Sequence, residues 1–292
     1  MKLIKNTFIL LFCLLHAVLA LGQNLDHEQW KVDRRKEIVG ENGWLNLAGL
    51  LWMDQEQVHL NEFSKDSLII SSEAGKKTIG TFRIQADSVW FSFNPKVIKK
   101  SESQSSGTTL QFPVESYNQG GVYFGRWKWS VIKRGDRFAV RLRDLEHPAL
   151  TKFEPIPAYN YDPAWRLDAF FEPRFNQFIS ITNVLGQVIE WRVMGIIKLQ
   201  VGGSPIELIA LEDQGKLFVI FSDETNGAGS YPSGRYLYVS YPDKTGKTVI
   251  DFNYSYNPPC AFTAFATCPI PPKENRLDMA IRAGEKYPLT EH

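Results

Sequence analysis

The sequence predicts an all-β protein, built mainly of antiparallel sheets in a sandwich or barrel-like arrangement, with a short N-terminal helix and an irregular C-terminal segment. Short stretches of alternating apolar and polar residues follow one another closely along most of the chain. The long helical patterns that alternate with strands in a parallel α/β fold are missing from the sequence. Aromatic residues make up 13% of the 292 residues, which also favours β-structure.

The N-terminus has the pattern of a secretory signal peptide. Lys2 and Lys5 precede an apolar run from Phe8 to Leu21, and small residues near Gly22 favour cleavage between Gly22 and Gln23. A retained membrane anchor is the alternative, but the run is short for a span. We therefore expect residues 1–22 to be removed, and the mature protein to be periplasmic or extracellular with no membrane span.

The balance of charges limits the classes of partner. The chain has 33 Lys and Arg residues against 32 Asp and Glu residues, which gives a formal net charge of +1. A nucleic-acid-binding protein needs a strongly basic face, so we expect no nucleic-acid partner. The apolar fraction of 43% is that of a globular protein.

The segment 26–39 is the clearest helix candidate, since apolar residues recur among many charges and Gly40 can end the helix. Strands are predicted at 78–84 and 88–93, where apolar and polar residues alternate. A connector from His147 to Pro163 contains four prolines. It separates a first half, residues 23–147, from a second half, residues 148–292, unless the two form one continuous domain.

The segment 122–143 predicts a β-hairpin that turns at Arg134-Gly135-Asp136. Alternation predicts one buried face and one solvent-exposed face. The exposed face would hold basic residues, among them Lys128, Arg141 and Arg143. Tryptophans in this and other strands fit either a core or a sugar-stacking surface, and their place on the apolar side of the alternation favours the core. These are Trp90, Trp127, Trp129, Trp165 and Trp191.

Two polar, irregular stretches interrupt the strand pattern in the second half. The first is FSDETNGAGSYPSGRYL, residues 221–237, and the second is DFNYSYNPPCAFTAFATCPIPPKENRLDMAIRAGEK, residues 251–286. Together with RWKWSVIKRGDRFAVRLRD (126–144) and GWLNLAGLLWMD (43–54), they resemble the domain-of-unknown-function family 1684 over nearly all of the mature chain. The resemblance implies a shared β-rich fold and no established reaction.

The polar residues of these two stretches are the candidate site. Asp223, Asp251 and Glu274 are candidate catalytic carboxylates for general acid–base chemistry. Candidate substrate-binding residues are Tyr231, Arg235, Asn253, Asn257 and Arg276. The alternative is a network of salt bridges and turns that holds long loops in place, because ion pairs are common outside active sites.

Cys260 and Cys268 remain after removal of Cys13 with the signal peptide. An even pair in an exported protein favours a disulfide. A reactive thiol would need a nearby base, and a metal site would need further ligands, so both alternatives have less support.

Three functions follow from this pattern. The first is a cofactor-free, hydrolase-like enzyme that acts on a small molecule through the 223–235 and 251–276 loops. The second is a module that binds a carbohydrate or a small anionic ligand without catalysis, and the third is a purely architectural motif. No Walker A loop, dinucleotide-binding glycine motif or Gly-x-Ser-x-Gly motif occurs, so no cofactor is implied.

Overall fold

The structure, a computed structural model, describes residues 22–97, 107–113 and 121–287. The predicted signal peptide lies outside the described residues, apart from Gly22. The chain divides into two compact units. Unit 1 combines the N-terminal segment up to Ile38 with Glu154–Phe262 and the chain from Thr267 onward, and unit 2 comprises Val39–Phe153 and Thr263–Ala266. The division after Phe153 falls within the proline-containing connector, and the N-terminal helix belongs to unit 1.

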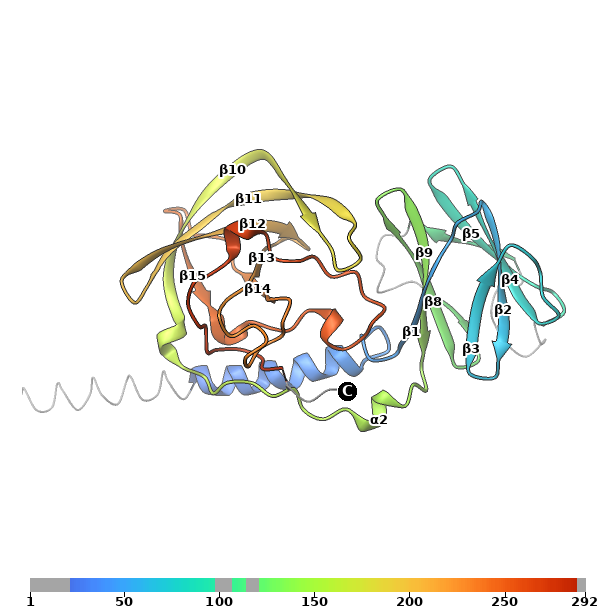
Figure 1. The fold of residues 1–292 in the computed structure, drawn as a ribbon, viewed down its shortest axis with the longest axis horizontal. Coiled ribbons are helices and arrows are strands. Elements are labelled where there is room, and N and C mark those ends of the chain that lie inside the picture. Colours follow the sequence, from blue (N-terminus) through green and yellow to red (C-terminus); the bar gives the residue numbers. More distant parts are fainter. Residues whose placement is uncertain (1–21, 98–106, 114–120, 288–292) are drawn as a thin grey trace, which may run out of the picture. The chain divides into compact units, whose positions relative to one another are not determined.

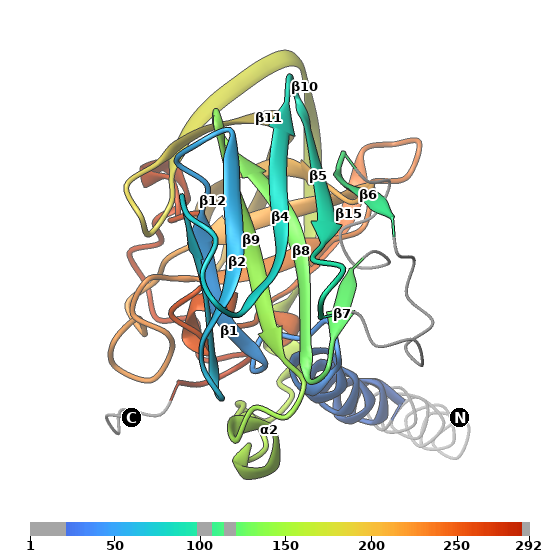
Figure 2. The same cartoon turned by 90° about the vertical axis from the view of Figure 1, so that its right-hand side faces the viewer.

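Unit 2 is a sandwich of two antiparallel sheets (Figure 2). One sheet has the order β3-β2-β4-β5-β6. Its strands are β2 (Gln57–Ser64), β3 (Ser67–Ser71), β4 (Thr78–Gln85), β5 (Ser88–Phe93) and β6 (Thr108–Phe112). The other sheet has the order β1-β9-β8-β7. Its strands are β1 (Leu47–Trp52), β7 (Val122–Phe124), β8 (Trp127–Arg134) and β9 (Arg137–Asp144).

Alternate residues of both sheets build the core of unit 2. Phe82 and Phe91 from one sheet meet Trp129 from the other, and the Phe91 and Trp129 ring centroids lie 5.1 Å apart. Because side chains alternate along a strand, the residues between these core positions face outward from the five-stranded sheet. Trp90 is one of them: its neighbours Val89 and Phe91 are buried, and Trp90 itself is half-buried.

The β8–β9 hairpin forms as predicted, but the prediction of a solvent-exposed face is wrong. Lys128, Arg141 and Arg143 on that face are all buried. The segment 41–46 covers them: the Lys128 ammonium donates to Asn42 Oδ1 at 2.8 Å, and the Arg143 guanidinium donates to Asn46 Oδ1 at 2.8 Å. Burial lowers the pKa of Arg143 to about 10. Basic residues in a strand can therefore be covered when a preceding loop supplies oxygen acceptors.

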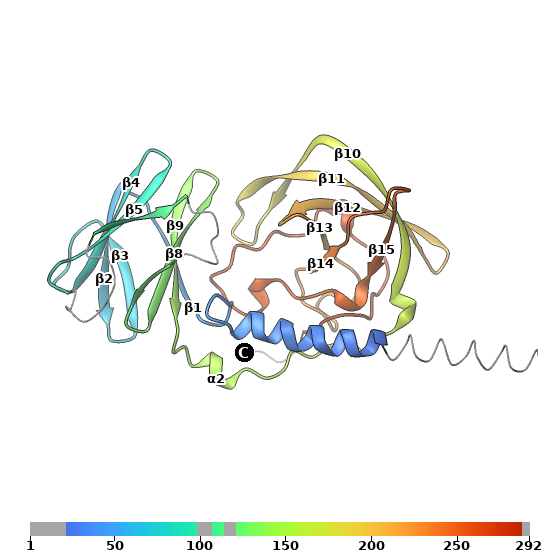
Figure 3. The same cartoon turned by 180° about the vertical axis from the view of Figure 1, so that it is seen from behind.

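Unit 1 is built on a six-stranded antiparallel sheet with the order β14-β13-β12-β11-β10-β15, curved into a half-barrel (Figures 1 and 3). The strands are β10 (Arg166–Thr182), β11 (Val188–Val201), β12 (Ser204–Asp213), β13 (Lys216–Phe221), β14 (Arg235–Val239) and β15 (Lys247–Asp251). The predicted all-β class with one N-terminal helix is thus confirmed.

The C-terminal segment of unit 1, Phe252–Phe262 and residues 267–287, is irregular, as predicted, and packs on the concave side of this sheet. It contains the short 3-10 turns η2 (Phe252–Tyr254), η3 (Pro259–Ala261) and η4 (Lys273–Asn275). Phe252, Leu277 and Ile281 from this segment join the core with Ile197 and Phe221 of the sheet. The segment is therefore part of the hydrophobic core of unit 1.

The N-terminal helix spans residues 22–39 in the described part of the chain. His27, Arg34 and Ile38 are its buried residues. Steps of seven and four residues place all three on one face of an α-helix. That face packs on the C-terminal segment, since the His27 ring bonds to the Asn253 carbonyl and Arg34 bonds to Glu285. The short connector helix α2 (Ala149–Lys152) lies at the end of unit 2.

Candidate functional site

Asp223 and Arg235 form a fully buried ion pair. The Arg235 Nη2 and Asp223 Oδ2 atoms lie 2.6 Å apart, and neither side chain is exposed. The other Asp223 oxygen accepts from the Thr225 amide at 2.8 Å and the Thr225 hydroxyl at 2.6 Å. Arg235 also donates to the backbone carbonyls of Ile281 and Ala283. This pair joins the 221–237 loop to the C-terminal segment and leaves neither charged group open to solvent.

The rest of the 221–237 loop is held by its own polar side chains. Asn226 accepts from the Asp223 amide at 2.7 Å and donates to the Tyr231 carbonyl at 2.8 Å. The hydroxyls of Thr225 and Ser230 lie 2.7 Å apart. Tyr231 is half-buried, and its ring centroid lies 5.0 Å from that of Tyr287. These polar groups of the loop are therefore hydrogen-bonded to one another, as is typical of a turn with a structural role.

Asp251 and Asn253 lie at the end of β15, at a second turn. One Asp251 oxygen accepts from the Asn253 amide at 3.0 Å, and the other accepts from the Tyr161 hydroxyl at 3.3 Å. Asn253 is buried and bonds to the backbone of Asp162 through both ends of its amide. Burial raises the pKa of Tyr161 to about 12, so this phenol stays protonated and donates to Asp251 at neutral pH.

Asn257 lies beside a second buried ion pair, which the sequence did not single out. Arg34 Nε and Glu285 Oε1 lie 3.0 Å apart, and both side chains are almost fully buried. Glu285 also accepts from the Asn257 amide at 2.7 Å, and Arg34 donates to the Asn257 carbonyl at 2.9 Å. Burial raises the pKa of Glu285, against the opposing effect of Arg34. The helical spacing that places Arg34 with His27 and Ile38 is the sequence signal for this pair.

Glu274 and Arg276 differ from the other candidates because both are exposed. Arg276 lies 3.9 Å from Asp278, and both of those side chains are mostly in solvent. Asn275, which lies between Glu274 and Arg276, is buried. Its side-chain amide donates to the Ile209 and Ile220 carbonyls, each at 2.9 Å. The three candidate carboxylates therefore have separate surroundings, namely Arg235 for Asp223, Asn253 and Tyr161 for Asp251, and solvent for Glu274.

Cys260 and Cys268 form a disulfide with their Cα atoms 6.2 Å apart, in agreement with the favoured prediction. Within the described ranges, no group of three or more His, Cys, Asp or Glu residues has the arrangement of a metal site. In the same part of the chain, no helix has the length and hydropathy needed to cross a membrane.

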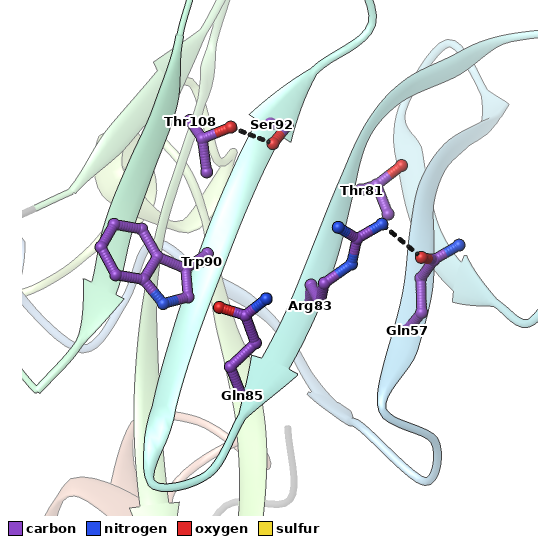
Figure 4. Close-up of a pocket in the computed structure, with 7 residues that line it drawn as sticks. All are labelled: Gln57, Thr81, Arg83, Gln85, Trp90, Ser92 and Thr108. Carbon is purple, nitrogen blue, oxygen red and sulfur yellow. Dashed lines mark hydrogen bonds between the residues drawn. The ribbon is translucent and has the colours of Figure 1, made fainter.

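A hollow of about 460 Å³ lies on the outer face of the five-stranded sheet of unit 2 (Figure 4). It is open to solvent, and its lining combines one indole, one guanidinium, two amides and three hydroxyls. These belong to Gln57, Thr81, Arg83, Gln85, Trp90, Ser92 and Thr108. Sequence reasoning did not single out this group of residues. It named Trp90 only among five tryptophans, for which it favoured a core position over a sugar-stacking surface.

Strand register explains why these side chains meet. Gln57 pairs with Arg83, and Arg83 pairs with Trp90, so the three form one row across β2, β4 and β5. Thr81, Ser92 and Thr108 form the adjacent row across β4, β5 and β6. Paired residues on neighbouring antiparallel strands have side chains on the same face, about 5 Å apart.

Two hydrogen bonds between lining residues connect neighbouring strands. Arg83 Nη2 donates to Gln57 Oε1 at 2.9 Å, and the Ser92 and Thr108 hydroxyls lie 2.7 Å apart. Both bonds are drawn in Figure 4. The hollow is thus a set of polar groups and one aromatic ring on a rigid sheet.

The sequence matches one family model, that of a protein of unknown function named DUF1684, over residues 151–286. The match covers the second half of the chain, so the prediction that the resemblance extends over nearly all of the mature chain was too broad. No curated protein matches this chain.

A solved structure that matches is the solution NMR structure of an uncharacterized protein of Haloarcula marismortui. It is 28% identical, with a TM-score of 0.39, and the match covers 47% of this chain and 78% of that one. The second half of the chain is thus similar to the DUF1684 family of proteins of unknown function.

Proposed function

We propose that this is an exported protein that binds a carbohydrate or a similarly hydroxylated small molecule in the hollow of unit 2. The observation that supports this most directly is the position of Trp90, a half-buried indole among six polar side chains on an open sheet face. The hollow has about the volume of an ordinary small-molecule site.

The chemistry of the lining suits a ligand with both hydroxyls and apolar C–H faces. An indole ring offers a flat apolar surface on which a sugar ring can stack. The amides of Gln57 and Gln85 can each donate and accept, as can the three hydroxyls. A purely apolar ligand would leave the remaining donors and acceptors of these groups without partners, which costs free energy.

The rigidity of the site also supports binding. The lining residues project from paired strands, and the Arg83–Gln57 and Ser92–Thr108 bonds restrict their rotamers before any ligand arrives. Side chains that are already ordered lose less entropy on binding.

A hydrolase-like reaction in the 223–235 and 251–276 loops has less support. A catalytic carboxylate must reach the proton that it transfers. Asp223 is enclosed in a buried ion pair, and Asp251 is bonded to a turn and to Tyr161. Their contacts favour the architectural interpretation of these loops.

Export rests on two features. The N-terminal pattern is that of a signal peptide, and the Cys260–Cys268 disulfide is typical of proteins in oxidising compartments. Expression of the full-length chain with its N-terminus, followed by cell fractionation and intact mass, tests the proposal. A secreted species that begins at Gln23 supports it, and a full-length species retained in the cytoplasm contradicts it.

Binding is tested with the mature protein against an array of glycans, followed by titration calorimetry with the best binder. Replacement of Trp90 by Ala should weaken binding at least tenfold, because it removes the stacking surface. Phe63 provides the matched control, since it is an exposed aromatic residue on β2 that does not line the hollow. Phe63→Ala should bind like the wild type. Equal binding by wild type and Trp90→Ala would reject the proposed site.

A further inference from the structure

We propose that the hollow of unit 2 selects acidic carbohydrates, with Arg83 as the residue that binds the carboxylate of a hexuronic acid. This inference rests on the proposed function and names the ligand class for the same site. It starts from the charge of the lining: among the seven described lining residues, Arg83 is the one ionic residue, and the other six are neutral.

Arg83 has no carboxylate partner among the described residues. Its side chain bonds to the neutral amide of Gln57, and no ion pair involves it in that part of the chain. Four carboxylates of unit 2 form ion pairs with other basic residues, namely Asp54–Arg137, Glu62–Lys77, Asp66–Arg126 and Asp87–Lys133. Among the described residues, the positive charge of Arg83 in the hollow therefore has no carboxylate that neutralises it.

The guanidinium is also oriented for recognition. The bond from Nη2 to Gln57 Oε1 at 2.9 Å uses one of the five N–H groups of Arg83. The remaining N–H groups permit the two parallel bonds by which arginine binds a carboxylate. Gln57 thus positions the side chain without neutralising it.

The neighbours of Arg83 fit the rest of such a sugar. Trp90 is the cross-strand partner of Arg83, and Thr81 and Gln85 are the next outward residues on the same strand β4. A hexuronate has a ring face that can stack on an indole, hydroxyls for amides and hydroxyl groups, and one carboxylate at the ring edge. Each of these features has a matching group in the hollow.

The test compares two ligands that differ only in the acid. Trigalacturonate and its fully methyl-esterified form are titrated into the mature protein at low and at physiological salt. The acid should bind about tenfold tighter or more, since a hydrogen bond to a charged group is worth more than a neutral one. The preference should shrink as salt rises, because the site is open to solvent.

The variant Arg83→Gln should lose the preference while it still binds the ester, and Arg83→Lys should keep a reduced preference because the charge remains. Thermal melts of both variants establish that they are folded. Equal affinity for acid and ester in the wild type, or an unchanged preference in Arg83→Gln, overturns the inference and leaves the proposed function standing. If neither ligand nor any neutral glycan binds, the proposed function fails as well.

Discussion

Asp223 and Arg235 show most clearly the structural role of individual residues in the 221–237 loop. Their side chains are fully buried and bonded to each other at 2.6 Å, so removal of either partner leaves an uncompensated charge inside unit 1. We expect Asp223→Ala to lower the free energy of unfolding by about 3–5 kcal/mol. Urea-induced unfolding followed by tryptophan fluorescence measures this change.

Arg276→Ala is the matched control, because Arg276 also lies within the residues that match the family model but is exposed. Its Nε atom lies 3.9 Å from Asp278 Oδ1. Surface ion pairs of this kind contribute little to stability. The urea midpoint of Arg276→Ala should match that of the wild type. A stable, folded Asp223→Ala protein that has lost an enzymatic activity would instead support the catalytic interpretation.

His27 makes the stability of unit 1 dependent on pH. Its ring is buried among Trp30, Tyr161 and Tyr254, and its Nε2 lies 3.0 Å from the Asn253 carbonyl. Burial lowers the pKa of His27 below its ordinary value of 6.5. The unfolded chain therefore takes up a proton at a higher pH than the folded protein does, and stability falls as the pH drops from 6.5 through the lower folded pKa.

His27→Gln tests this dependence. Glutamine can still donate to the Asn253 carbonyl but does not titrate. Melting temperatures measured from pH 7.5 to pH 5 should fall less steeply for His27→Gln than for the wild type. His147→Gln, on the connector, should retain the slope of the wild type. Identical slopes for His27→Gln and the wild type would show that His27 is not responsible.

At the scale of elements, the close approach of β10 to β11 depends on Gly195 in β11. Gly195 pairs with Pro173 on β10, next to a shift in strand register. A Cβ atom at Gly195 would lie 2.4 Å from the Glu172 carbonyl oxygen and 2.5 Å from the Phe171 ring. Gly195→Ala should lower the free energy of unfolding by about 1–3 kcal/mol, as expected for overpacking.

Gly49 in β1 is the control for this substitution. A Cβ atom there would be in ordinary contact, 3.5 Å from the Leu51 side chain. Differential scanning calorimetry should therefore detect a lower melting temperature for Gly195→Ala and a much smaller change for Gly49→Ala. Equal effects at the two sites would contradict the role of close backbone approach in β11.

The elements were largely predictable, because alternation and turn residues are local. The strands β4, β5, β8 and β9 and the helix follow directly from residue periodicity. The covering of Lys128 and Arg143 was not predictable, since it depends on a loop some 85 to 100 residues away. The prediction that Trp90 belongs to the core is wrong. Trp90 alternates with Ser88 and Ser92, on the face opposite to the buried Val89 and Phe91, so it faces outward.

At the scale of the whole molecule, the chain has two hydrophobic cores, one in each unit. The family match covers most of unit 1, where the polar loop residues close the C-terminal segment onto the half-barrel. The hollow lies in unit 2, outside the matched residues. The sequence singled out Asp223 and Arg235 as site candidates but did not predict that they are buried together, because this contact depends on the return of the chain at Ile281 and Ala283.

The central claim, that ligand binds in the hollow of unit 2, is tested most directly by NMR of the indole N–H groups. The protein has eight tryptophans, and single substitutions assign their signals. Titration with the best glycan should shift the Trp90 indole signal and leave those of Trp165 and Trp191 in unit 1 unchanged. Shifts confined to the unit 1 tryptophans, with the Trp90 signal unmoved, would contradict binding in the hollow. They would indicate a site in unit 1, where the 223–235 and 251–276 loops are the candidates.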